Sequence, residues 1–106
     1  MNTKTTIAKM VRRIARKFHP LRIILFGSRA RGTAGPDSDV DLLVVFPRLR
    51  FRRRRAVEIY KLLAGSTIPK DILVVNIADI EAQRNVVGTV IREALQEGKT
   101  LYERSA

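Results

Sequence analysis

Two apolar segments, each with polar residues at one end, constrain this chain more than any other feature. The first, residues 21–26, ends on Gly27-Ser28, and the second, residues 39–46, begins with Asp39-Val40-Asp41. Apolar runs of this length bounded by turn residues are typical of buried strands. We therefore predict two neighbouring strands, with a glycine bend closing the first and two carboxylates opening the second.

The spacing of these two carboxylates suits a shared divalent cation. Side chains two apart on a strand point to the same face, so Asp39 and Asp41 would lie about 6.6 Å apart along the backbone. Gly27 would let an anion approach the backbone, because it has no Cβ. Ser28 would add a hydroxyl donor at the start of a helical turn, where negative charge is favoured. The pattern predicts a site for a metal-bound phosphate.

A third carboxylate is expected at the same edge of the sheet. A third apolar run, residues 72–75, is preceded by Pro69-Lys70-Asp71, and a helical segment separates it from the second run. A helix between two strands favours a parallel pair with a right-handed crossover. Asp71 would then stand beside Asp39 and Asp41. The alternative is a turn residue at the strand entrance.

Helical periodicity predicts three longer helices around these strands. An amphipathic helix ends before Pro20. A second helix follows the arginine run and ends at Gly65, and we expect it to turn inward the side chains of Val57, Tyr60, Leu63 and Ala64. A third begins at Asp79 as N-cap and ends at Gly98, with inward side chains at Ile80, Val87, Ile91, Ala94 and Leu95. Residues 100–103 add an edge strand. The expected fold is α/β (α+β), a small mixed sheet of three to four strands flanked by helices, in one domain spanning residues 1–106.

Composition narrows the class of partner. The 21 Lys and Arg residues exceed the 10 Asp and Glu residues, and a net charge of +11 predicts attraction to polyanions. Residues 48–55 hold six arginines. We favour a solvated face for them, then an acidic partner. Nucleic acid is least favoured, because only Phe51 lies nearby.

Other features bear on location and redox chemistry. No cysteine is present, which excludes disulfides and thiolate metal sites. The longest apolar run, residues 42–46, is too short to cross a bilayer, so no membrane partner is expected. The absence of a signal peptide favours the cytoplasm.

The combined motifs resemble a known superfamily. Gly27-Ser28, ten residues, then Asp39-Val40-Asp41 between two apolar runs is similar to the signature of the nucleotidyltransferases that include DNA polymerase β. The sequence around these motifs most resembles that of the minimal nucleotidyltransferase (MNT) antitoxins. The resemblance implies the polymerase β-like fold, ATP as substrate and two Mg²⁺ ions held by Asp39, Asp41 and Asp71. It implies that Asp71 also orients and deprotonates the acceptor hydroxyl.

The resemblance also implies nucleotide contacts around the bend. Gly27 and Ser28 would bind the triphosphate, with Ser38 as a secondary contact. Arg29 is expected to pair with phosphate. Arg31 is a second candidate, and a salt bridge is the alternative for either arginine.

The function implied is that of a magnesium-dependent protein adenylyltransferase. Such antitoxins transfer AMP to a tyrosine of a HEPN-type ribonuclease toxin, with which this protein would form a hetero-oligomer. Two alternatives remain open: a non-catalytic antitoxin that inhibits the toxin by complex formation, and nucleotidyl transfer to a small molecule.

Overall fold

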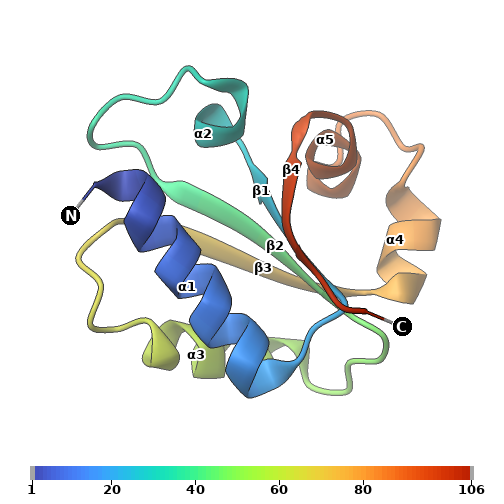
Figure 1. The fold of residues 1–106 in the computed structure, drawn as a ribbon. Helices are drawn as coiled ribbons and strands as arrows, with labels where there is room; N and C mark the ends of the chain where they lie inside the picture. The colour runs from blue at the N-terminus through green and yellow to red at the C-terminus, as the bar shows by residue number, and fades with distance from the viewer. Residues whose placement is uncertain (1, 106) are drawn as a thin grey trace.

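The computed structural model describes residues 2–105, in which a mixed sheet is covered by helices on both faces (Figure 1). Four strands form the sheet over this range, in the order β3-β2-β1-β4. They are β1 (Arg22–Phe26), β2 (Val40–Phe46), β3 (Lys70–Asn76) and β4 (Lys99–Glu103). The helices are α1 (Thr3–Phe18), α2 (Ser28–Arg31), α3 (Arg52–Leu62), α4 (Ile77–Gln83) and α5 (Val90–Glu97). The predicted α/β fold class is confirmed.

Strand pairing follows the predicted directions. β1 runs antiparallel to β2, and β2 runs parallel to β3. The helix α3 makes the crossover between the parallel strands. β4 pairs antiparallel with β1 and forms one edge of the sheet, as expected for residues 100–103. The start of β2 and the start of β3 therefore lie at the same end of the sheet.

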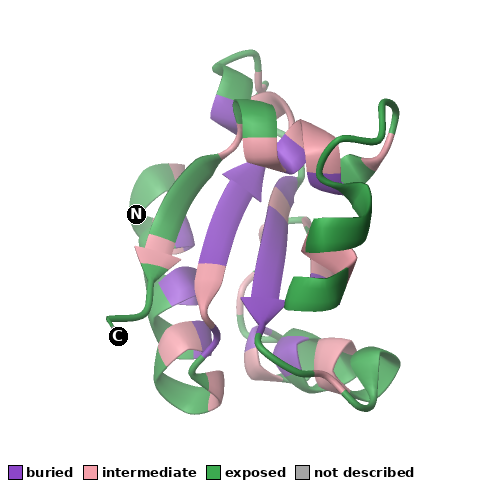
Figure 2. Cartoon of the chain, turned by 90° about the vertical axis from the view of Figure 1, so that its right-hand side faces the viewer, coloured by how far each residue is buried: buried purple, intermediate pink, exposed green. Residues whose placement is uncertain are grey.

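Alternating side chains divide the interior into two layers. On one face α1 and α3 pack over Ile23, Leu42, Val44 and Val74. On the other face α5 packs over Ile24, Leu43, Val45 and Val75, with Ile80 of α4 beside them. β1 and β2 are buried almost throughout, whereas β4 is largely exposed (Figure 2). Rigid central strands thus support the loops at the end where Gly27 and Asp41 lie.

The prediction of a single C-terminal helix is wrong, because the segment forms two helices, α4 and α5. Asn76, and not Asp79, is the N-cap of α4; Asp79 is the third helical residue and completes a reciprocal capping box. α4 ends at Gln83, and Gly88 turns the chain with a φ of 90° before Thr89 caps α5. Val87 lies in this connection and is 80% exposed, so it contributes nothing to the core.

The inward side of α3 also differs from the expected one. Leu63 is fully buried, as predicted, and so is Ile59, which was not predicted. Val57, Tyr60 and Ala64 are exposed. The buried face is therefore rotated by about 100° from the predicted one, which corresponds to one residue on a helix with 3.6 residues per turn. Within residues 2–105 no helix has both the length and the apolar character that crossing a membrane requires.

Candidate active site

The glycine bend is built against a carboxylate. β1 ends at Phe26, and Gly27 turns the chain into α2 with a φ of 74° and a ψ of −158°. This backbone region is open almost only to glycine. A Cβ on Gly27 would also collide with Oδ2 of Asp41 and would lie 3.2 Å from its Cγ. The bend therefore needs glycine twice over: for its backbone conformation and for the space that Asp41 takes.

Register brings the predicted carboxylates together from separate parts of the chain. Asp41 pairs with Phe26 across the antiparallel strands and with Asp71 across the parallel ones. Asp39 precedes β2 by one residue and is exposed. Gly27, Asp39, Asp41 and Asp71 thus lie at one end of the sheet, in the arrangement that the strand pattern predicts.

The Asp41 carboxyl sits in an electrostatically unfavourable position. Its partial burial raises its pKa, and the negative charges of Asp71, Asp39 and Glu93 raise it further. Arg31 acts in the opposite direction. Burial and like charges both disfavour the ionised form. A bound cation would relieve this repulsion, so the excess negative charge favours cation binding at this site.

An open cavity of about 410 Å³ lies beside these groups. Its lining comprises Phe26, Gly27, Ser28, Arg31, Ser38, Asp39, Asp41 and Glu93. Asp71 stands outside this lining, next to Asp41. The N–H groups of Ala30 and Arg31 donate to the Gly27 carbonyl oxygen, whereas within residues 2–105 the N–H group of Ser28, which lines the cavity, has no backbone acceptor. Donors for an anion and carboxylates for a cation therefore meet in one depression.

Two of the predicted nucleotide contacts are engaged within the protein. Nε and Nη2 of Arg29 donate to the carbonyl oxygen of Ser38, at 3.1 and 2.7 Å. The Ser38 hydroxyl oxygen accepts a hydrogen bond from the Gly35 amide at 2.9 Å. The α2–β2 loop is thereby tied to the helix that follows the bend. Arg29 anchors the loop that carries Asp39 into the site.

Sequence reasoning missed Glu93, which lines the cavity and pairs with Arg31. Nη1 of Arg31 lies 3.1 Å from a carboxylate oxygen of Glu93 and 3.5 Å from one of Glu97. For Arg31 the structure thus favours the salt bridge. Glu93 comes from α5, whose packing against β1 brings it to the cavity. No local motif marks Glu93, because its position depends on tertiary packing alone.

The donor set fits a hard divalent cation. Carboxylate oxygens are the ligands that Mg²⁺ prefers, and it is held in such sites by few carboxylates together with substrate phosphates. Asp39 and Asp41 are available for this, and Asp71 is adjacent. In the described part of the chain, no group of three or more His, Cys, Asp or Glu side chains is already close enough to hold a metal. The phosphates would complete such a site.

Carboxylates from two strands beside a glycine bend define the class of site, one suited to a metal-bound phosphate ester. Residues 7–100 match the family described as the nucleotidyltransferase domain. The chain belongs to this family. No curated protein sequence matches it.

Several solved structures share the fold. One is a candidate nucleotidyltransferase from Sulfolobus solfataricus, with a TM-score of 0.67 at 21% identity, covering 94% of this chain and 79% of that one. A toxin–antitoxin complex with AMP-PNP aligns with a TM-score of 0.63 at 20% identity, covering 97% of this chain and 75% of that one. A third pairs a tri-AMPylated Shewanella oneidensis HEPN toxin with an MNT antitoxin, with a TM-score of 0.56 at 19% identity over 95% and 70%.

Proposed function

We propose that this protein is an adenylyltransferase antitoxin that transfers AMP from ATP to a tyrosine hydroxyl of a HEPN-type ribonuclease toxin. The observation that carries the proposal is the meeting of the Gly27 bend, Asp41 and Asp71 at one end of the sheet. In a chain of the nucleotidyltransferase family, that geometry supports a working transfer site.

Each residue has a defined task in the proposed reaction. The amides at Gly27 and Ser28 and the Ser28 hydroxyl bind the β- and γ-phosphates. The tyrosine oxygen bonds to the α-phosphorus as the bond to the bridging oxygen breaks, and pyrophosphate leaves. Asp71 accepts the tyrosine proton. When bound by Asp39, Asp41 and Asp71, two Mg²⁺ ions would supply charge stabilisation to the attacking and leaving oxygens.

The supporting loop also has a proposed place in nucleotide binding. Arg29 holds the Ser38 carbonyl, and Ser38 caps the turn at Gly35. The other N–H groups of Arg29 and the hydroxyl hydrogen of Ser38 are proposed to face the nucleotide. A fixed loop would keep Asp39 in position to bind the metal, so less entropy would be lost on binding.

The partner is proposed from the structural neighbours. Two complexes that share this fold are toxin–antitoxin pairs, and one of them contains an AMPylated HEPN toxin. A HEPN toxin presenting a tyrosine would form a hetero-oligomer with this chain. Covalent AMP would add charge and bulk where RNA enters the toxin. Because the proposed reaction consumes ATP, we propose that it takes place in the cytoplasm.

The test uses α-labelled ATP, Mg²⁺ and the protein encoded by the adjacent reading frame. Label on a tyrosine of that partner supports the proposal. Asp39→Asn and Asp41→Asn should each lower labelling at least about a hundredfold, since loss of metal stabilisation removes several kcal/mol. Asp37→Asn is the matched control, because Asp37 is an exposed acid on the same loop and does not line the cavity.

Other outcomes would overturn the proposal. A tight complex without label would indicate inhibition by occlusion. Label on an aminoglycoside and not on the partner would indicate transfer to a small molecule. A change below threefold in the Asp41→Asn variant would remove the metal role assigned to Asp41.

A further inference from the structure

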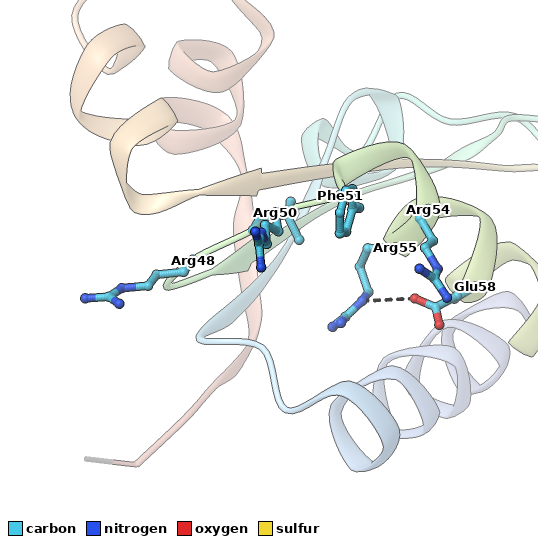
Figure 3. A pocket seen from close by; sticks show the side chains of 7 residues that line it. Arg48, Arg50, Phe51, Arg54, Arg55 and Glu58 are labelled. Carbon is cyan, nitrogen blue, oxygen red and sulfur yellow. Dashed lines mark hydrogen bonds and ion pairs between the residues drawn. The ribbon is translucent and has the colours of Figure 1, made fainter.

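A second cavity lies at the opposite end of the sheet from the active site. It measures about 650 Å³ and is formed by the loop that follows β2 and by the first turns of α3 (Figure 3). Its lining includes Arg48, Arg50, Phe51, Arg54, Arg55 and Glu58. Asp41 is near the start of β2 and this loop follows its end, so about 20 Å of strand separates the two sites. The second cavity is independent of the first.

Positive charge is concentrated in the loop and helix start that form this cavity and in α1, which packs beside α3. Residues 1–19 and 47–57 contain twelve of the 21 basic side chains and none of the ten acidic ones. The cations of α1 lie on its exposed side, and α1 is packed beside α3. We call this surface, formed by α1 and residues 48–55, the basic face. The helix α1 alone extends it by about 24 Å.

Most of the cavity's arginines have no acidic partner. The Arg55 guanidinium lies 5.0 Å from the centroid of the Phe46 ring and 5.2 Å from that of the Phe18 ring. Its Nε pairs with a Glu58 carboxylate oxygen at 3.2 Å (Figure 3). Within residues 2–105, by contrast, Arg48, Arg50 and Arg54 form no ion pair. Because they form no ion pair, these three arginines are available for an external anion. Such an anion would also reduce the repulsion among their positive charges.

An exposed aromatic ring lies among these arginines. Phe51 is 61% exposed, and the Arg50 guanidinium is 6.0 Å from its ring centroid. Phe51 occupies the N-cap position of α3 but makes no side-chain capping bond. Neither core packing nor capping accounts for a phenylalanine here. Its free π-face can stack on a nucleobase.

We propose that the basic face binds single-stranded nucleic acid. Arg48, Arg50 and Arg54 would pair with backbone phosphates, and Phe51 would stack on a base. An acidic protein is the other occupant that exposed arginines could attract, and the oligoglutamate measurement below distinguishes it from a nucleic acid. A single nucleotide is too small for a face that follows a whole helix. The sequence alone favoured a solvated face; the exposed ring beside unpaired arginines changes that interpretation.

The test measures binding of fluorescent 12-nucleotide oligo(U) and oligo(dT) to the full chain by anisotropy. Affinity should fall linearly with salt on logarithmic axes, with a slope of about −3.5 if about five phosphates are contacted. Arg50→Ala/Arg54→Ala should weaken binding at least tenfold. Phe51→Leu keeps an apolar side chain but removes the ring, and it should weaken binding about fivefold, which is the effect of about 1 kcal/mol of lost stacking.

Arg84→Glu is the control for charge, because it changes the net charge by as much as the double arginine variant. Arg84 is exposed at the C-cap of α4, which lies on the other side of the sheet. Binding by this variant should equal that of the parent. Equal affinity for the two oligonucleotides indicates recognition of any single strand, and tighter oligo(U) binding indicates RNA; either result supports the proposal.

Three results would overturn it: no binding at low salt, equal weakening by Arg84→Glu, or unchanged binding by Phe51→Leu together with equal affinity for an oligoglutamate. The last would mean that the basic face receives an acidic protein. The variants lie outside the active site, so failure here leaves the proposed transferase activity untouched.

Discussion

Tyr60 reaches around the open edge of β3 to hold Asp71. Its hydroxyl donates to Oδ1 of Asp71 at 3.3 Å and accepts from the Ile72 amide at 2.8 Å. α3 packs on one face of the sheet. Asp71 points to the other face, because it is two and four residues before Leu73 and Val75, which pack there. One exposed tyrosine therefore satisfies an edge amide and fixes the carboxylate proposed as the base.

Tyr60→Phe should lower both stability and labelling. Loss of one hydrogen-bonding hydroxyl costs about 0.5–1.5 kcal/mol in the free energy of unfolding. Asp71 would gain rotational freedom, so labelling should fall several-fold. Tyr102→Phe is the matched control, because the Tyr102 hydroxyl makes no hydrogen bond within residues 2–105. Denaturant unfolding and a labelling time course measure the two effects; equal behaviour of the two variants would remove the role given to Tyr60.

Gly27→Ala should destabilise the protein and abolish labelling. The backbone at Gly27 is costly for any other residue, by about 1–3 kcal/mol, and the new Cβ would displace the Asp41 carboxylate. Gly32→Ala provides the comparison, because Gly32 has a φ of 79° but no atom within 4 Å of an added Cβ. We expect a loss of at least about a hundredfold in labelling for Gly27→Ala and nearly normal labelling for Gly32→Ala. Similar labelling by both would indicate that only backbone strain matters.

Asp41→Asn should stabilise the protein at neutral pH while it abolishes transfer. The folded state raises the pKa of Asp41 above its ordinary value of 3.8, so the folded protein retains the proton to higher pH than the unfolded chain. Stability therefore falls as pH rises through the interval between those two pKa values, and the cost persists at neutral pH. Asparagine avoids this cost.

Thermal unfolding without divalent cations measures the effect. The Tm of Asp41→Asn should exceed that of the parent by a few degrees at pH 7, and the gain should vanish near pH 3, below the ordinary pKa. Asp37→Asn should show no comparable gain. A lower Tm for Asp41→Asn at pH 7 would mean that hydrogen bonding, not charge, governs this position.

Arg29→Lys should loosen the loop that carries Asp39. Lysine cannot reproduce the paired N–H donation that Arg29 makes to the Ser38 carbonyl. Amide hydrogen exchange over residues 33–39 should accelerate, and labelling should fall about tenfold. Arg31→Lys retains an exposed ion pair with Glu93 and should leave that exchange unchanged. Normal loop protection in Arg29→Lys would show that Arg29 is not the anchor.

The strand core and the convergence of its acids could be predicted because they depend on local signals. Apolar runs bounded by Gly27 and Asp41 define strands, and a helix between two strands fixes their direction. The site's outer parts depend on tertiary packing. Glu93 reaches the cavity only because α5 folds back on β1, and no pattern around it indicates this.

The errors in the helices have physical causes. Apolar residues at helical spacing continue through Gly88, but the Asn76 capping box and the Thr89 cap divide the segment into two helices. For α3, Val57 and Tyr60 fit an apolar stripe by composition. The sheet buries Ile59 together with the predicted Leu63, which leaves Tyr60 free to reach Asp71.

The central claim is that the Gly27 bend and the adjacent carboxylates hold a metal-bound triphosphate. Calorimetric titration of the isolated chain with ATP, with Mg²⁺ or with EDTA, tests this without any partner. We predict that binding requires Mg²⁺, weakens at least tenfold in Asp41→Asn and is unchanged in Asp37→Asn. Equal affinity for ATP in EDTA, or full affinity in Asp41→Asn, would contradict the account.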